Sequence, residues 1–110
     1  MSHTQFETQT QKKRIYRQGD VILVPVDISQ HDLELYGRLV SDRIEIGSEN
    51  GHRHIMQGVK LYRYYIGQVI VVEEPTPLVH EQHPTIIVTP GIYVVRFVRD
   101  WLLRESRPVD

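Results

Sequence analysis

The chain has 110 residues and a formal net charge of −1, with 40% hydrophobic and 25% charged residues. This length allows one compact core, and the composition is that of a globular protein rather than of a disordered or fibrous one. A charge near zero provides no global attraction to nucleic acid or to anionic lipid. The chain has no cysteine, which excludes disulfides and thiolate metal ligands, so we expect a single cytoplasmic domain.

Three segments differ in composition. Residues 1–14 are polar and predict a flexible N-terminal arm, residues 15–103 hold the hydrophobic runs of a single β domain, and residues 104–110 predict a C-terminal tail. The N-terminal residues contain no apolar run typical of a signal peptide, and no later run approaches membrane-spanning length.

The first half of the domain alternates a strand, a short helix and a second strand. Residues 21–24 are rich in β-branched side chains and end at Pro25, which is typical of a buried strand. Near residues 30–36 we expect the one short helix, with Ser29 as its N-cap and Gly37 as its end. After Gly37 the hydrophobic residues alternate up to Ile46, which favours a half-exposed strand before the turn sequence Glu49-Asn50-Gly51.

The second half predicts only strands and turns. Further strands are expected at residues 59–62, 69–72, 85–88 and 92–98. The last two are joined by Thr89-Pro90-Gly91, whose proline and glycine suit a tight turn, so we expect these two strands to form a hairpin. About seven short strands with closely spaced turn signals predict an all-β fold, either a small β-sandwich or a barrel.

Four of the six histidines form two close pairs, His52 with His54 and His80 with His83. Residues two apart in a strand face the same way, so the first pair should project together. Prolines around the second pair exclude a helix, and we expect that pair at the end of a strand that runs into a loop. If the turn that contains Asn50 and the loop before Thr85 lie side by side in the folded sheet, the four imidazoles surround one point.

Such a set of imidazoles suits a divalent transition metal. Zinc is the first expectation, with nickel, iron or copper as alternatives. We predict His52, His54, His80 and His83 as ligands and Glu81 as an orienting or acid–base residue. Hydrolysis of a phosphoester would be the corresponding reaction, with Arg53 as a second catalytic candidate beside Glu81.

Three other interpretations stay open. Paired histidines could act without metal as general acid and base in a phosphodiesterase or ribonuclease, with Arg53, Lys60 or Arg63 to hold the phosphate. The domain could instead be a non-catalytic module that binds a partner, or a second copy in a homodimer, through exposed strand edges. The histidines could also simply decorate an exposed strand and cap a loop.

Three tyrosines stand close together beside Arg63. Tyr62, Tyr64 and Tyr65 could form a surface on which bases stack, although alternating tyrosines more often pack across strands.

The order of motifs resembles an uncharacterised family of small bacterial and phage proteins. The shared features are a Gly-Asp-Val strand at residues 19–21, a Gly-His-x-His turn at 51–54, a His-Glu-x-His-x-Pro-like segment at 80–84 and a Pro-Gly-x-Tyr hairpin at 90–93. The resemblance covers residues 18–100, and residues 98–101 depart from it. It implies that the two histidine pairs act as a unit and implies no particular reaction.

Overall fold

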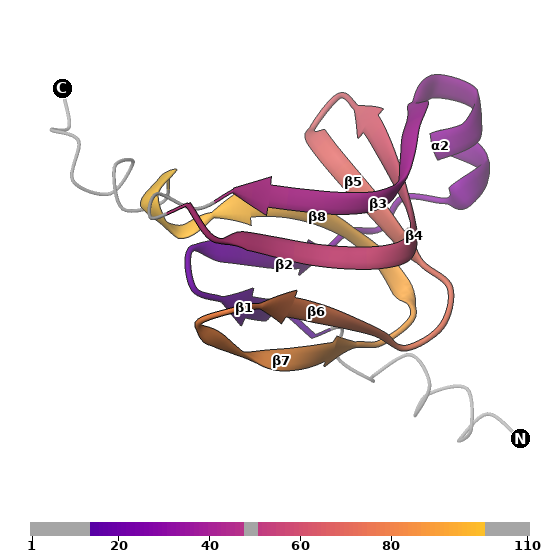
Figure 1. The fold of residues 1–110 in the computed structure, drawn as a ribbon. Coiled ribbons are helices and arrows are strands. Elements are labelled where there is room, and N and C mark those ends of the chain that lie inside the picture. Colours follow the sequence, from indigo (N-terminus) through magenta and orange to yellow (C-terminus); the bar gives the residue numbers. More distant parts are fainter. Residues whose placement is uncertain (1–13, 48–50, 101–110) are drawn as a thin grey trace, which may run out of the picture.

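A computed structural model describes residues 14–47 and 51–100 of the chain (Figure 1). The fold is all-β with one complete short helix, as the hydrophobic pattern predicts, and residues 98–100 are also helical. The elements in chain order are β1 (Tyr16–Gln18), β2 (Val21–Pro25), α2 (Gln30–Tyr36), β3 (Arg38–Gly47), β4 (Arg53–Tyr64), β5 (Gly67–Val72), β6 (Thr76–His80), β7 (His83–Val88) and β8 (Gly91–Phe97). Three predicted features lie outside the described residues. They are the N-terminal arm at 1–14 except for Arg14, the turn residues Glu49 and Asn50, and the C-terminal tail at 104–110.

All strand pairs are antiparallel, and their order is β1-β2-β8-β5-β4-β6-β7, with β3 added to β4. The long strand β4 pairs with β3 on one edge. On its other edge it pairs first with β6, through Ile55 and Val79, and then with β5 along residues 60–64. Gly58, with a φ of +76°, lies between these two halves, at a backbone angle that glycine adopts without strain. The start of β4 therefore stands beside the end of β6.

The sheet curls until its two terminal strands, β1 and β7, touch (Figure 1). Inside the curl lies the larger hydrophobic core, whose residues come from β1 to β8. The side chain of Gln18 at the end of β1 closes the gap, because its Nε2 donates hydrogen bonds to the carbonyls of Leu78 and Pro84, both at 2.9 Å. One end of this curled sheet carries the histidines.

A second, smaller core lies on the outer face of the sheet under α2. Leu33, the only buried residue of this helix, packs with Tyr62, Val69, Val71 and Val94. The helix begins and ends where the sequence predicts, since Ser29 Oγ accepts from the N–H of Asp32 and the N–H of Gly37 donates to the carbonyl of Leu33.

We expect the Ser29→Ala variant to lose about 1 kcal/mol of unfolding free energy, the usual value of such an N-cap. Urea denaturation of the two proteins measures this difference. A Ser29→Asp variant, which restores an acceptor at the cap, should recover most of the loss.

The strand β1 was absent from the sequence-based prediction. His80 lies at the end of a strand, β6, as predicted, but the expected loop is instead a β-hairpin to β7, with Glu81 and Gln82 as its two-residue turn. Pro77 and Pro84, which exclude a helix here, both lie within strands of this hairpin. Pro84 is on β7, the last strand in the order, and Pro77 is on β6 before Val79, where β6 pairs with β4. Each proline therefore lies where one edge of its strand has no ladder partner.

Candidate metal centre

The strand ladder places three histidines in one row. Ile55 on β4 is the antiparallel register partner of Val79 on β6. His54 precedes Ile55 and His80 follows Val79, so the two histidines lie opposite each other. His80 in turn is the register partner of His83 on β7. Directly opposite residues share a face of the sheet, and this face turns inward at His54, which is 1% exposed, and at His80, which is 5% exposed.

The four imidazole rings form one cluster with His80 at its centre. The ring centroid of His80 lies 4.2 Å from that of His54, 4.6 Å from that of His83 and 5.9 Å from that of His52. The His54 and His83 centroids are 6.2 Å apart. The structure thus brings together both histidine pairs, although they are separated by more than 20 residues in the sequence.

Gln18 fixes the orientation and the tautomer of His54. The amide nitrogen of Gln18 donates to two backbone carbonyls, so its Oε1 faces His54 Nδ1 at 2.8 Å as an acceptor. His54 Nδ1 must therefore carry the proton, and its Nε2 keeps the lone pair. Burial, followed by the nearby His80 and His83, lowers the pKa of His54 to about 4, so this ring is neutral at pH 7.

His80 has the opposite tautomer. The backbone N–H of Gln82 donates to His80 Nδ1 at 3.0 Å, so the proton of the neutral ring is on Nε2. This Nε2 is buried and has no hydrogen-bond partner among the residues that the structure describes. Burial also lowers the pKa of His80, with further contributions from His83 and His52. An unpaired buried donor is costly in a native protein, and it marks a place where a ligand or ion can add a partner.

The β1–β2 turn covers His83. Gly19 has a φ of +58°, and a Cβ at this position would lie 2.7 Å from His83 Nε2. Glycine is therefore required here both by the backbone angle and by the close approach of the ring. The neighbouring Asp20 is near enough for its charge to raise the pKa of His54, against the larger lowering effects.

His52 reaches the cluster from just before β4. Its Nδ1 is hydrogen-bonded to a carboxylate oxygen of Glu81, whose side chain is 73% exposed at the rim. A neutral His52 donates from Nδ1 to that carboxylate, which leaves its Nε2 with a lone pair. His52 and His54 thus both have Nδ1 held by an acceptor, the usual arrangement of histidines that bind metals through Nε2.

Other residues considered from the sequence lie elsewhere. Arg53 faces away from His54 and is ion-paired with Glu45 at 2.6 Å, so the structure does not bring it to the cluster. Lys60 pairs with Glu73 at 3.3 Å. Of the remaining histidines, His31 is on α2, and His3 lies outside the described residues.

Sequence reasoning missed Gln18, Gly19 and Gln82. Gln18 is one of the few buried polar residues, and its role depends on the approach of β1 to the β6–β7 hairpin. The one available signal was its position directly before the Gly19-Asp20 turn, which does not show what the turn covers.

A comparison with known protein families matches most of the chain. A family model described as "Domain of unknown function (DUF8820)" matches residues 17–97, from β1 to the end of β8. The chain belongs to this family. The matched DUF8820 domain includes all four clustered histidines together with Gln18 and Gly19. Searches of curated proteins and of solved structures returned no match.

The histidines of this DUF8820 domain are not arranged as a complete metal-binding site in the structure. Among residues 14–47 and 51–100, no group of three or more His, Asp or Glu side chains is arranged to bind an ion as it stands. In the same part of the chain, no helix is both long and apolar enough to cross a membrane.

Proposed function

We propose that the histidine cluster binds one divalent transition-metal ion, with zinc as the first candidate. The observation that carries this proposal is the convergence of the other three rings on His80, which joins two histidine pairs that are distant in the sequence. Rings bound to one tetrahedral ion through nitrogens 2.0–2.1 Å away have centroids about 5 Å apart. The observed separations of 4.2 to 6.2 Å scatter around that value.

The protonation of the rings supports the proposal. Metals bind neutral imidazole, and the lowered pKa values of His54 and His80 favour the neutral rings at pH 7. His54 and His52 both present Nε2 lone pairs because Gln18 and Glu81 occupy their Nδ1 atoms. His80 would join them only by giving up the hydrogen bond from Gln82, so binding involves a small rearrangement of the Glu81-Gln82 turn.

Burial favours a metal ion over metal-free acid–base catalysis. The opposite tautomers of His54 and His80 do provide one acceptor and one donor, as a general base and a general acid require. However, the two rings are 1% and 5% exposed. A general acid and a general base must themselves lie within hydrogen-bond reach of the substrate. An ion bound to these rings and to His52 can instead keep its open position toward the rim, where Glu81 is exposed.

Phosphoester hydrolysis is the reaction we propose for an ion that keeps an open coordination position. Glu81 is the residue of this chain that supports it, because it is exposed at the rim and contacts His52. Glu81 would then exchange protons with solvent while orienting His52. Loss of bis(p-nitrophenyl) phosphate hydrolysis in Glu81→Gln, with metal binding retained, is the expected outcome.

Metal binding is tested directly with tag-free protein. Zinc at 100 times its dissociation constant should stabilise the folded state by about 2.7 kcal/mol, which raises the melting temperature by about 10 °C in a domain of this size. The ion count should be one per chain by elemental analysis. The amide signal of Gln82 in an NMR spectrum should shift on binding, since its hydrogen bond is lost.

Single substitutions separate the cluster from adventitious binding. His83→Ala and His52→Ala should abolish most of the thermal shift, whereas His31→Ala, on the exposed face of α2, should retain it in full. Absence of a shift with zinc, nickel and cobalt would exclude the proposed centre. An equal shift in all three variants would place the ion elsewhere.

A further inference from the structure

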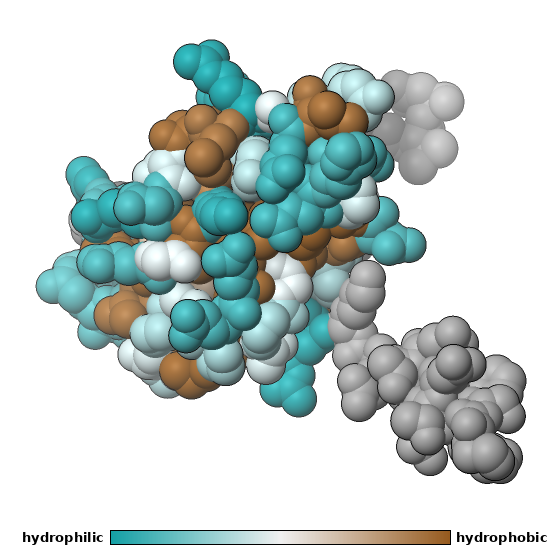
Figure 2. All heavy atoms as spheres, turned by 90° about the vertical axis from the view of Figure 1, so that its right-hand side faces the viewer, coloured by the Kyte–Doolittle hydropathy of each residue, from teal (hydrophilic) through white to brown (hydrophobic). Residues whose placement is uncertain are grey.

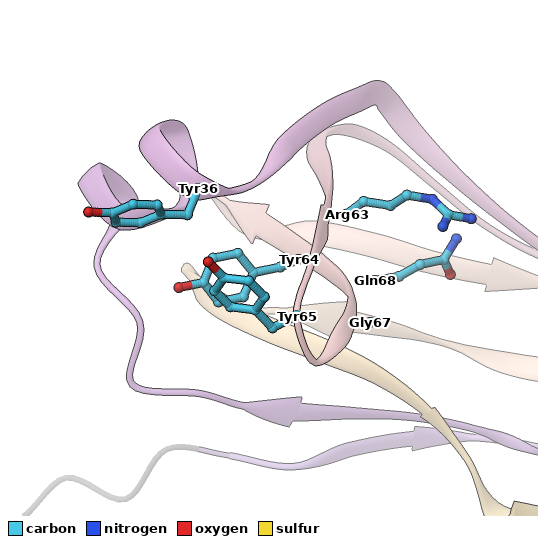
Figure 3. Close-up of a pocket in the computed structure, with 6 residues that line it drawn as sticks. All are labelled: Tyr36, Arg63, Tyr64, Tyr65, Gly67 and Gln68. Atoms are coloured by element: carbon cyan, nitrogen blue, oxygen red, sulfur yellow. The ribbon is translucent and has the colours of Figure 1, made fainter.

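A second site lies at the far end of β4 from the histidines. A pocket of about 380 Å³ is lined by residues of α2 and of the β4–β5 hairpin, namely Tyr36, Arg63, Tyr64, Tyr65, Gly67 and Gln68 (Figure 3). Its volume is within the range of sites for small ligands or single nucleotides. None of these residues contributes to the histidine cluster, so this pocket is independent of the proposed metal centre.

The tyrosines form an exposed aromatic wall. Tyr36, Tyr64 and Tyr65 gather on one side of the β4–β5 turn in Figure 3, and the Tyr64 and Tyr65 ring centroids are 4.9 Å apart. Tyr65 is 81% exposed and Tyr36 is 61% exposed. The prediction that these tyrosines pack across strands fits Tyr62, which is buried in the core under α2, but it does not fit Tyr65.

Positive charge stands beside this wall. Arg63 and Gln68 leave their strands together on the other side of the turn from the rings (Figure 3). Arg38 is the register partner of Arg63, and two like charges directly opposite each other in a ladder are unfavourable. In the described part of the chain, no carboxylate pairs with Arg38 or Arg63. A bound anion would relieve this repulsion.

A third arginine approaches from β8. Arg96 Nη1 lies 3.2 Å from the position that a Cβ on Gly67 would take, so the glycine leaves room for the guanidinium beside the turn. The charge of Asp32 also reaches this region, where it helps to raise the pKa of Tyr64 behind the larger effect of burial. Figure 2 shows this end of the molecule, where apolar patches alternate with hydrophilic side chains.

We propose that this pocket binds single-stranded nucleic acid, with a base stacked on the tyrosines and the neighbouring phosphate held by Arg63 and Arg38. Aromatic faces that stack bases beside cationic groups that follow the backbone are the usual means of binding single strands. The tyrosines and Arg63 lie on opposite sides of the turn, so a strand that spans it makes both contacts. A mononucleotide makes only one.

The test uses fluorescence anisotropy with a labelled 12-nucleotide oligothymidylate and the full chain. Tyr65→Ala should weaken binding about tenfold, because stacking on one aromatic side chain contributes roughly 1–3 kcal/mol per base. Arg63→Ala should reduce the slope of log K against log salt concentration by about 0.7, the value for one phosphate contact on a single strand. Thymidine monophosphate should compete poorly.

Two control variants remove similar exposed side chains elsewhere on the chain. Arg53→Ala removes an exposed arginine that is paired with Glu45, and Ile87→Ala removes an exposed apolar side chain on β7. Both variants should bind like the unaltered protein. The proposal fails if the oligonucleotide does not bind, or if Arg53→Ala weakens binding as much as Arg63→Ala. It also fails if only a proline-rich peptide binds, since aromatic grooves can take that ligand instead.

Discussion

Replacing Gln18 by leucine is expected to lower the free energy of unfolding by about 3 to 5 kcal/mol, the sum for several buried polar groups that lose their partners. The substitution removes the hydrogen bonds to the carbonyls of Leu78 and Pro84 and to Nδ1 of His54. Leucine fills a similar volume, so the loss reports on polar pairing rather than on a cavity. Chemical denaturation of both proteins under chelating conditions measures it.

A matched control is Gln57→Leu. Gln57 lies on β4 but is exposed, and substitutions at such positions usually change stability by no more than about 0.5 kcal/mol. A loss for Gln18→Leu that is no larger than for Gln57→Leu would show that the closure of the sheet does not depend on Gln18.

The second large effect is a loss of stability in acid. The unfolded chain takes up a proton on His54 near pH 6.5, whereas the folded protein takes it up only near pH 4. Between these values the unfolded state binds more protons, so lowering the pH favours unfolding. This shift corresponds to about 3 kcal/mol between pH 7 and pH 4, and the lowered pKa of His80 acts in the same direction.

The measurement is the unfolding free energy of metal-free protein at several pH values. His54→Asn places an amide N–H where His54 Nδ1 stands, so it can still donate to Gln18, but it does not titrate. Its stability should depend less on pH, by the contribution of this one group. His31→Asn should keep the full pH dependence. A His54→Asn protein with an unchanged profile would contradict the assignment of the effect to His54.

The sequence predicted those parts of the fold that are determined by residues close together in the chain. Ser29 and Gly37 mark the ends of α2 because capping and termination involve neighbouring residues only. The turn at Pro90 was predicted for the same reason, but the hairpin expected there was wrong. The strands that it joins are not neighbours, because β7 pairs with β6 whereas β8 pairs with β2 and β5. His80 lies at the end of a strand, as predicted, but the loop expected after it is the second strand of a hairpin that holds His83. This strand was missed because a proline such as Pro84 is tolerated in a strand only where the tertiary fold leaves an edge unpaired.

The candidate site was partly visible in the sequence. Spacing alone grouped the histidines into two pairs, but their tautomers depend on Gln18 and on the Gln82 amide, which meet them only in the folded chain. The alternation of residues on β4 shows why Arg53 was a poor candidate: it adjoins His54 in the sequence and therefore faces the other way. The exposure of the tyrosine wall likewise could not be predicted, because it depends on which side of β4 is covered by α2.

The strand β4 connects the two ends of the molecule, with His54 near its start and Tyr64 at its last position. Ten residues of extended chain separate these points by roughly 30 Å. Charges this far apart are screened at physiological salt, where the Debye length is about 8 Å. An ion held at one end would thus leave the electric field at the other nearly unchanged, so charge at one proposed site would not affect binding at the other.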